Sequence, residues 1–223
     1  MLNLREVVRC AHCKLTNRQR LMACAIADTV SDHGVRIALL EQASRLYRSV
    51  KRRYPNTMGS EFLGHDKQQG KAYVWRSSTF RFRYTRHEDI TQLSYRSKSL
   101  DVIAHSDVLE HVYDYRAALH ECSRVLAPGG ALVFTVPFFQ ERATSLLRGK
   151  PNPDGSLTHF ASPEYHGDGV RSAGIYTFHW FGLDLLDEIR AAGFAQVDVG
   201  FCYAPELGFA STSGVFRAIK QTS

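Results

Sequence analysis

Four polar side chains that could bind a ligand or move a proton lie in one short segment: Ser106, Asp107, Glu110 and His111. Carboxylates accept hydrogen bonds and hold cations, and an imidazole can exchange a proton near neutral pH. The segment directly follows an apolar run over residues 100–104. If that run is a buried strand, these side chains lie at its carboxyl end, where open α/β sheets bind ligands. The pattern therefore predicts a binding site at this position.

A strand, a helix and a second strand are predicted around this segment. Residues 100–104 and 131–136 are apolar runs with several β-branched side chains, typical of strands buried on both faces. Asp114 can cap the helix between them, and Pro128-Gly129-Gly130 ends that helix. A strand–helix–strand unit of this size is a parallel crossover.

Weaker signals continue the alternation of strands and helices along the chain. We expect helices over 18–30, 42–53 and 183–192, and strands over 35–40 and 58–63. Residues 64–78 are expected to form an irregular excursion. Further expected strands lie over 80–84, 195–203 and 214–219. The fold class predicted is α/β: an open, mostly parallel Rossmann-like sheet with helices on both faces and a C-terminal antiparallel strand pair.

Residues 100–137 resemble the second half of the class I S-adenosylmethionine-dependent methyltransferases. In that family an apolar strand ends in D-V-L-E-H-V, a helix ends in R-V-L-x-P-G-G, and the next strand closes with Pro. The chain matches these motifs over 107–112, over 124–130 and at Pro137. The resemblance implies the Rossmann-like fold, S-adenosyl-L-methionine as the cofactor and methyl transfer as the activity.

The resemblance also implies which residues contact the cofactor. Glu61 ends the second strand, where an acidic side chain accepts hydrogen bonds from the ribose hydroxyls. Asp89 is expected near the adenine, and Glu41 with Asp107 along the methionine portion. The full implied set is Glu41, Gln42, Glu61, Phe62, Asp89, Ile90, Ser106 and Asp107.

The first strand is not followed by the Gly-x-Gly turn that this family usually has. A branch of bacterial proteins resembling this chain instead carries Glu-Gln-x-Ser/Thr followed by an aromatic residue, then G-S-E-Y/F-L and a late H-x-F-G. Residues 41–44, Tyr47, 59–63 and 179–182 match those motifs. The missing glycines leave an alternative function open, a non-catalytic binding or scaffold protein with the same fold.

No obligatory catalytic group is expected, because methyl transfer from a sulfonium is an in-line displacement that depends mainly on alignment. A general base is needed only where the acceptor is protonated at neutral pH. Histidines are the candidates, although a lone histidine in a loop is more often a surface group or a core hydrogen-bonding group. These candidates are His111, His159, His166 and His179.

A small-molecule or glycan acceptor is the expected substrate class. The formal net charge is +6, and five basic residues fall within the helix expected over 42–53. Such a face is more often simply solvated, but it leaves a nucleic-acid-binding module as a second alternative.

Cys10 and Cys13 have the spacing of half a zinc knuckle. In related proteins an earlier Cys pair precedes a segment that Arg5, Glu6 and Arg18 match. Two ligands cannot close a tetrahedral site, so the pair is interpreted as a metal-free remnant whose partner pair lay upstream of Met1. Residues 1–16 are then expected to be poorly anchored.

The composition fits one α/β domain, since the chain has 223 residues of which 44% are hydrophobic. No run approaches the ~18 apolar residues of a membrane span, and the amino terminus lacks a signal core. A soluble, cytoplasmic protein without membrane contact is expected. The domains expected are an N-terminal appendage over 1–33 and a methyltransferase-like domain over 34–223, with 138–177 as a substrate-side insertion.

Overall fold

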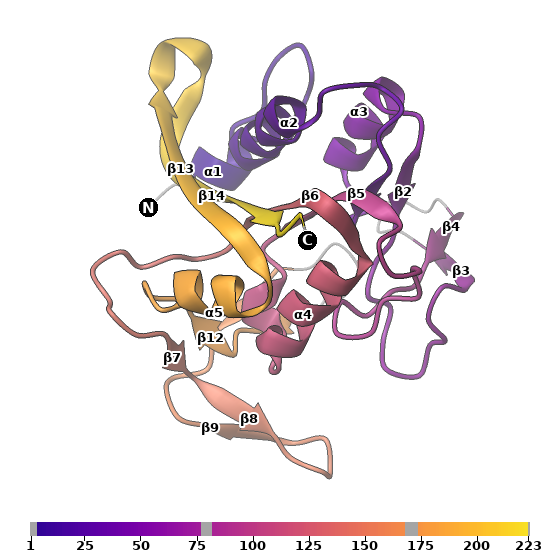
Figure 1. Ribbon diagram of the computed structural model, residues 1–223. Coiled ribbons are helices and arrows are strands. Elements are labelled where there is room, and N and C mark those ends of the chain that lie inside the picture. The colour runs from indigo at the N-terminus through magenta and orange to yellow at the C-terminus, as the bar shows by residue number, and fades with distance from the viewer. Residues whose placement is uncertain (1–3, 77–81, 168–173, 223) are drawn as a thin grey trace.

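One six-stranded sheet organises the molecule in the computed structural model, which describes residues 4–76, 82–167 and 174–222. The strand order is β13-β14-β6-β5-β1-β2 (Figure 1). β2, β1, β5 and β6 are mutually parallel, whereas β14 is antiparallel to both β6 and β13. The predicted fold class is confirmed. The strands are β1 (Ile37–Leu39), β2 (Thr57–Gly59), β5 (Leu100–Ser106), β6 (Leu126–Thr135), β13 (Phe194–Ala204) and β14 (Phe209–Lys220).

Helices cover both faces of this sheet because successive side chains of its strands point to opposite faces. Ile37 and Leu39 of β1 pack in a cluster with α2 and α3. Ala38, between them, packs in the cluster that contains α4 and α5. The central strands are therefore buried on both faces, as their apolar runs predict. The helices are α2 (Asn17–Thr29), α3 (Arg45–Arg53), α4 (Tyr115–Val125) and α5 (Leu185–Ala191).

Side-chain caps fix where the helices begin. Thr16 and Gln19 form a capping box at the start of α2. Asp114 accepts a hydrogen bond from the backbone within the first turn of α4, as predicted. Ser44 caps α3, so this helix begins at Arg45 and not at the expected residue 42.

A separate hairpin follows β2. It pairs β3 (Ala72–Arg76) with β4 (Phe82–Arg86) in antiparallel register. The expectation of an irregular excursion over 64–78 is therefore wrong for 72–76, which forms a strand. Part of the strand expected over 80–84 lies outside the described residues.

The segment after β6 forms small antiparallel strand pairs. β7 pairs with β12, β8 with β9, and β10 with β11. No helix in the described ranges is both long and apolar enough to cross a membrane. The remaining elements are α1 (Leu4–Val7), η1 (Leu109–His111), η2 (Pro205–Leu207), β7 (Leu146–Leu147), β8 (Gly149–Pro151), β9 (Leu157–His159), β10 (Tyr165–His166), β11 (Ile175–Tyr176) and β12 (His179–Trp180).

The N-terminal segment packs on the sheet. Met22 and Ile26 of α2 are fully buried in the cluster formed with β1 and α3. Arg5 of α1 makes two hydrogen bonds to Asp107, directly after β5. The expectation that residues 1–16 are poorly anchored is therefore wrong for α1, because its ion pair reaches the sheet.

Candidate active site

Three carboxylates lie at one edge of the sheet. Glu41 follows β1, Glu61 follows β2 and Asp107 follows β5. These strands are adjacent and parallel in the order β5-β1-β2, so their carboxyl ends meet at the same edge. The structure thus brings together three of the residues that the sequence assigns to a cofactor site.

Side chains stabilise the glycine-free turn after β1. The backbone N–H of Ala43 donates to Glu61 Oε1 at 2.7 Å, so the turn is tied to the end of β2. Ser44 Oγ donates to Glu41 Oε1 at 3.0 Å and also accepts from the backbone at the start of α3. Hydrogen bonds to carboxylates therefore hold the turn that glycines form in the resembling family.

Close packing of Gln42 and Tyr47 against β2 depends on Gly59. A Cβ atom at Gly59 would lie 2.5 Å from the Tyr47 ring and 2.9 Å from Gln42 Cγ. Gln42 also hydrogen-bonds the backbone of β4, accepting from Arg86 N and donating to Tyr84 O at 3.0 Å each. The predicted cofactor residue Gln42 thus links the turn to the β3–β4 hairpin.

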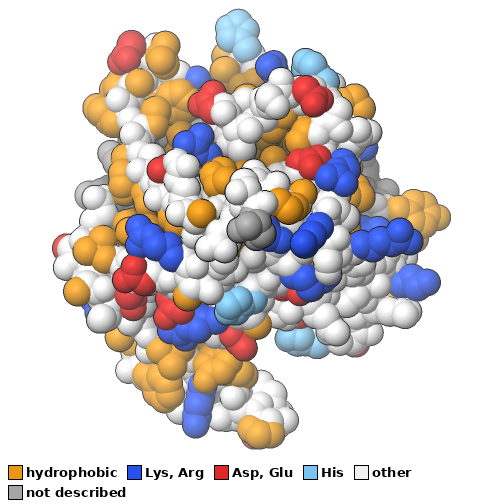
Figure 2. All heavy atoms as spheres, viewed as in Figure 1, with side chains coloured by type: hydrophobic (Ala, Val, Ile, Leu, Met, Phe, Trp, Pro, Cys, Tyr) orange, Lys and Arg blue, Asp and Glu red, His pale blue; other side chains and the backbone are white. Residues whose placement is uncertain are grey.

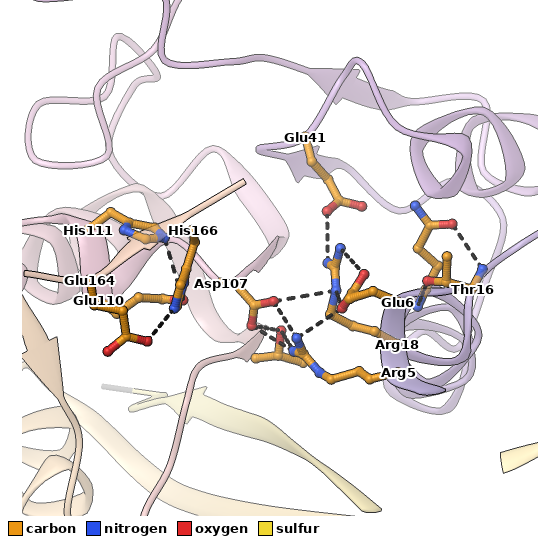
Figure 3. A network of polar contacts seen from close by, with 12 residues as sticks. Arg5, Glu6, Thr16, Arg18, Glu41, Asp107, Glu110, His111, Glu164 and His166 are labelled. Carbon is orange, nitrogen blue, oxygen red and sulfur yellow. Dashed lines mark hydrogen bonds and ion pairs between the residues drawn. The ribbon is translucent and has the colours of Figure 1, made fainter. Parts of the chain in front are cut away.

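Two arginines from the N-terminal segment reach the acidic edge, by which we mean the carboxyl ends of β1, β2 and β5 with Glu41, Glu61 and Asp107 (Figure 3). Arg5 binds Asp107 through two hydrogen bonds of 2.7 Å. Arg18 lies 3.4 Å from Asp107, 3.6 Å from Glu41 and 2.7 Å from Glu6. The sequence does not predict that Arg5 and Arg18 reach these carboxylates. The one signal for both residues is the motif around the Cys pair, which they match.

Two of the carboxylates beside these arginines, Asp107 and Glu41, titrate differently. Burial acts to raise the pKa of Asp107, but hydrogen bonds from Arg5 and the charge of Arg18 lower it to about 2. Burial raises the pKa of Glu41, and the weaker attraction of Arg18 only partly opposes this. Asp107 also has a φ of +51°, a left-handed conformation that Asp tolerates better than most residues. The charged contacts and Thr135, whose hydroxyl donates to it at 2.9 Å, hold that conformation.

The remaining predicted cofactor residues follow β2 and β4 or end β5. Asp89 caps a turn by accepting hydrogen bonds from the backbone and hydroxyl of Thr91. Ile90 is buried, and the ring of Phe62 lies 5.5 Å from that of His87. Ser106 lies next to Glu41.

The four candidate bases occupy three different places. His111 and His166 come together with their rings edge to face, 4.9 Å apart. His159 lies on the β8–β9 hairpin and contacts the Tyr176 hydroxyl at 3.1 Å. His179 is buried, which lowers its pKa, and its ring hydrogen-bonds the backbone before α4.

Glu110 lies between the paired histidines and is fully buried. Burial raises the pKa of Glu110 to about 7, although the neighbouring His166 acts in the opposite direction. The neighbouring carboxylate of Glu110 is the main cause that raises the pKa of His166. From the sequence, Glu110 is predicted only as part of the polar segment after the strand, without a specific role.

The Cys10–Cys13 pair forms a tight turn, in which Lys14 N donates to Cys10 O at 3.0 Å and Lys14 has a φ of +60°. Backbone hydrogen bonds from Cys13 and His12 lower the pKa of Cys10 to about 7. In the described ranges, neither cysteine belongs to a cluster of three potential metal ligands. That the pair is free of metal stays a prediction.

The basic residues of α3 lie away from its buried side, which consists of Leu46 and Val50. Figure 2 shows Lys and Arg side chains on the viewed face of the molecule, several of them close together on its right side. The nucleic-acid alternative stays a prediction.

Comparisons with known proteins agree with this architecture. Residues 42–134 match the model of the methyltransferase domain family. A Mycolicibacterium smegmatis protein named "Probable S-adenosylmethionine-dependent methyltransferase" is 27% identical over 113 residues, which are 51% of this chain and 41% of that relative. The chain thus matches less than half of the relative's length.

Solved structures share the fold at low sequence identity. An S-adenosylmethionine-dependent methyltransferase from Mesorhizobium loti superposes with a TM-score of 0.53 at 17% identity, covering 88% of this chain and 96% of that one. The Burkholderia thailandensis 1,6-didemethyltoxoflavin-N1-methyltransferase, solved with its substrate and S-adenosylhomocysteine, gives a TM-score of 0.55 at 15% identity. That alignment covers 91% of this chain and 78% of the other.

Residues 42–134 therefore resemble the methyltransferase domain family, and the Rossmann-like fold of the chain resembles that of S-adenosylmethionine-dependent methyltransferases.

Proposed function

We propose that this chain transfers the methyl group of S-adenosylmethionine to a small-molecule acceptor. The observation that carries the proposal is the charged cluster at the carboxyl edge of β5, β1 and β2. There Glu41 and Asp107 alternate with Arg5 and Arg18 at distances of 2.7–3.6 Å. Alternating charges of this kind suit a zwitterion, which carries both signs within a few ångströms.

The charges of the cofactor complement those of this cluster. The amino-acid end of S-adenosylmethionine carries a carboxylate and an ammonium group, and its sulfonium adds a second positive charge. Two guanidinium groups, Arg5 and Arg18, face three carboxylates, Glu6, Glu41 and Asp107, so the ionised cluster has a net charge of −1. The arginines would hold the cofactor carboxylate, and Glu41 with Asp107 the ammonium group.

The other strand ends would hold the nucleoside. Glu61 is assigned to the ribose hydroxyls, since a carboxylate accepts hydrogen bonds from a diol. Asp89, Ile90 and Phe62 are assigned to the surroundings of the adenine, with Gln42 and Ser106 completing the cofactor residues. When bound, the cofactor supplies a methyl carbon that is activated by the adjacent sulfonium.

The protein would act mainly by alignment. Holding the acceptor in line with the reacting carbon can supply on the order of 7–11 kcal/mol at best. Where the acceptor atom carries a proton, a base or an equivalent group is also needed. Of the predicted histidines, His111 and His166 lie with Glu110, whose carboxyl interacts electrostatically with Asp107.

A small-molecule acceptor is favoured by the Burkholderia structure, whose bound substrate is a small molecule. The segment after β6 would cover that acceptor, since it contributes His166 next to the loop that follows β5. A glycan is the second acceptor class that the chain could take.

Calorimetry with S-adenosylmethionine tests the cofactor site. We expect the unmodified chain to bind, and Glu61→Ala to weaken binding by about 1.5–3 kcal/mol, or roughly 10- to 150-fold, because a hydrogen bond to a charged group is lost. Glu206→Ala is the matched control, since Glu206 is exposed on η2.

Each outcome separates the alternatives. Equal binding by the unmodified chain and Glu61→Ala removes Glu61 from the site. No binding by the folded, unmodified chain contradicts the proposal and favours the non-catalytic scaffold. Thermal unfolding of each variant shows whether loss of the Ala43 hydrogen bond has disturbed the fold.

A further inference from the structure

Three potential metal ligands converge beside the cofactor edge. Ligand atoms of Glu110, His111 and His166 all lie within 4.8 Å of one another (Figure 3). Glu110 and His111 belong to η1, directly after β5, whereas His166 belongs to β10 in the segment after β6. Two segments that are distant in sequence thus contribute to one cluster.

The carboxylate at the centre of this cluster lacks hydrogen-bond donors. Glu110 is fully buried, and neither of its oxygens accepts a hydrogen bond from a described residue. A buried charged group without compensation is costly, so such groups are normally paired, hydrogen-bonded or bound to a metal. The nearest ring nitrogens, His166 Nδ1 and His111 Nε2, lie 3.6 and 3.8 Å from Oε1.

The distances from the two histidine nitrogens to Glu110 Oε1 are too long for hydrogen bonds, since they exceed the 2.7–3.2 Å of a normal N–H···O bond. They are instead close to the spacing of ligand atoms around a shared ion. Bonds of about 2.1 Å in a tetrahedral zinc site place neighbouring ligand atoms about 3.4 Å apart. The two distances to Glu110 Oε1 are within a few tenths of an ångström of that spacing, and the three ligand atoms, which all lie within 4.8 Å of one another, would move closer together to bind a common ion.

In each histidine, the outer ring nitrogen, which is the one that does not face Glu110, already has a hydrogen-bond partner. His111 Nδ1 lies 2.8 Å from the carbonyl oxygen of Tyr176, which can only accept a hydrogen bond. His166 Nε2 lies 3.0 Å from a carboxylate oxygen of Glu164. In the neutral rings these outer nitrogens carry the protons, and the inner nitrogens direct their lone pairs toward Glu110. Metal-binding histidines are typically oriented by such carbonyl and carboxylate partners.

The carboxylate that orients His166 is itself anchored. Glu164 accepts a hydrogen bond from Trp180 Nε1 at 2.9 Å and forms an ion pair with Arg148 at 3.2 Å. Arg148 is buried, so the residues that anchor Glu164 belong to the packed interior. The orientation of His166 is therefore fixed by the fold.

We propose that Glu110, His111 and His166 form a binding site for a divalent transition-metal ion, with Zn²⁺ as the fitting species. Two imidazoles and one carboxylate are an open zinc ligand set that leaves the fourth position of a tetrahedral ion to water or to a substrate oxygen. Mg²⁺ and Ca²⁺ prefer all-oxygen ligands, so they fit this set poorly. The bound ion fastens the segment after β6 to the loop after β5.

Metal binding is measured on a Cys10→Ser/Cys13→Ser chain, so that the Cys10–Cys13 pair cannot bind the added ion. Equilibrium dialysis with Zn²⁺ and the visible absorption of added Co²⁺ report the site directly. We expect one ion per chain, and we expect Glu110→Gln and His166→Asn each to weaken binding at least 100-fold. His159→Asn is the matched control, because His159 lies in the same segment outside the cluster and should bind as the Cys10→Ser/Cys13→Ser chain does.

The result does not depend on methyl transfer, since the readout is the ion itself. Zn²⁺ should also raise the melting temperature of the Cys10→Ser/Cys13→Ser chain and not that of the two ligand variants. Because Glu110 is buried, Glu110→Gln could disturb the fold; the half-buried His166 then provides the decisive variant. A folded Cys10→Ser/Cys13→Ser chain that binds no ion, or binding that survives His166→Asn undiminished, overturns the proposal.

Discussion

Individual ionisable residues show how the neighbours of a side chain decide its charge. Asp107 is half-buried against two arginines, and its pKa falls to about 2. His105, two residues earlier, is buried without a hydrogen-bonding partner among the described residues, and burial lowers its pKa to about 3. Both shifts change how the stability of the protein depends on pH, in ways that single substitutions can separate.

Asp107→Asn should reduce the stability of the protein at neutral pH and remove one component of its acid sensitivity. The pKa of Asp107 is about 2 in the folded chain and about 3.9 in the unfolded chain. The contribution of ionised Asp107 to the free energy of unfolding is therefore complete above pH ~4, and it is lost as the pH falls toward 2. Urea unfolding from pH 7 to 2 measures the difference between the two proteins. A difference that does not shrink below pH 4 contradicts this assignment.

His105→Leu should stabilise the protein, and more so at pH 5 than at pH 8. The unfolded histidine binds a proton near pH 6.5, whereas the folded one does so only near 3, so protonation favours unfolding in between. The gain should grow by up to about 1.4 kcal/mol for each pH unit below 6.5. His120→Leu, at an exposed position of α4, is the control substitution. Unfolding free energies at several pH values test this expectation.

Secondary-structure elements are stabilised by caps and by contacts with the sheet to different extents. α2 and α4 begin at side-chain caps and bury one face each. α1 spans only Leu4–Val7 and has no buried residue, and so short a helix is unstable by itself. Its position depends on Arg5, which binds Asp107 across 102 positions of sequence.

Asp114→Ala should weaken α4 through loss of its N-cap. The Asp114 carboxylate accepts a hydrogen bond from Ala117 N at 3.0 Å. Removing such a cap costs about 0.5–2 kcal/mol. Denaturant titration should show a lower midpoint with an unchanged slope. Asp114→Ser keeps a capping oxygen and should recover most of the loss; equal loss in both variants would mean that the cap contributes little.

At the scale of the whole molecule, the C-terminal strands complete the core. Phe216 of β14 is fully buried, and its ring stacks on Phe134 of β6 at 4.8 Å and meets Phe138 at 5.1 Å. The antiparallel strand β14 therefore belongs to the same hydrophobic cluster as α4 and α5.

Phe216→Ala should destabilise the whole molecule by about 3–5 kcal/mol, because it removes a large side chain from a packed core. Phe201→Ala, on the neighbouring strand β13, is the matched control because Phe201 is 44% exposed. It should cost much less. Calorimetric unfolding of both variants tests this, and similar losses would indicate that the core does not depend on Phe216.

The sequence by itself determined the features that depend on short-range patterns. Apolar runs with β-branched residues predicted the central strands, and Asp114 predicted where one helix begins. These signals are local, because a strand or a helix cap involves residues only a few positions apart. The carboxylates Glu41 and Asp107 met at one edge for the same reason, since each directly follows a predicted parallel strand.

Only the tertiary structure decided which distant residues complete the site. Arg5 and Arg18 reach the acidic edge because α2 packs on the sheet, and His166 meets Glu110 because the segment after β6 returns to the loop after β5. No local pattern encodes such contacts: they arise when separate elements bury their apolar faces against one sheet and thereby bring their polar side chains together.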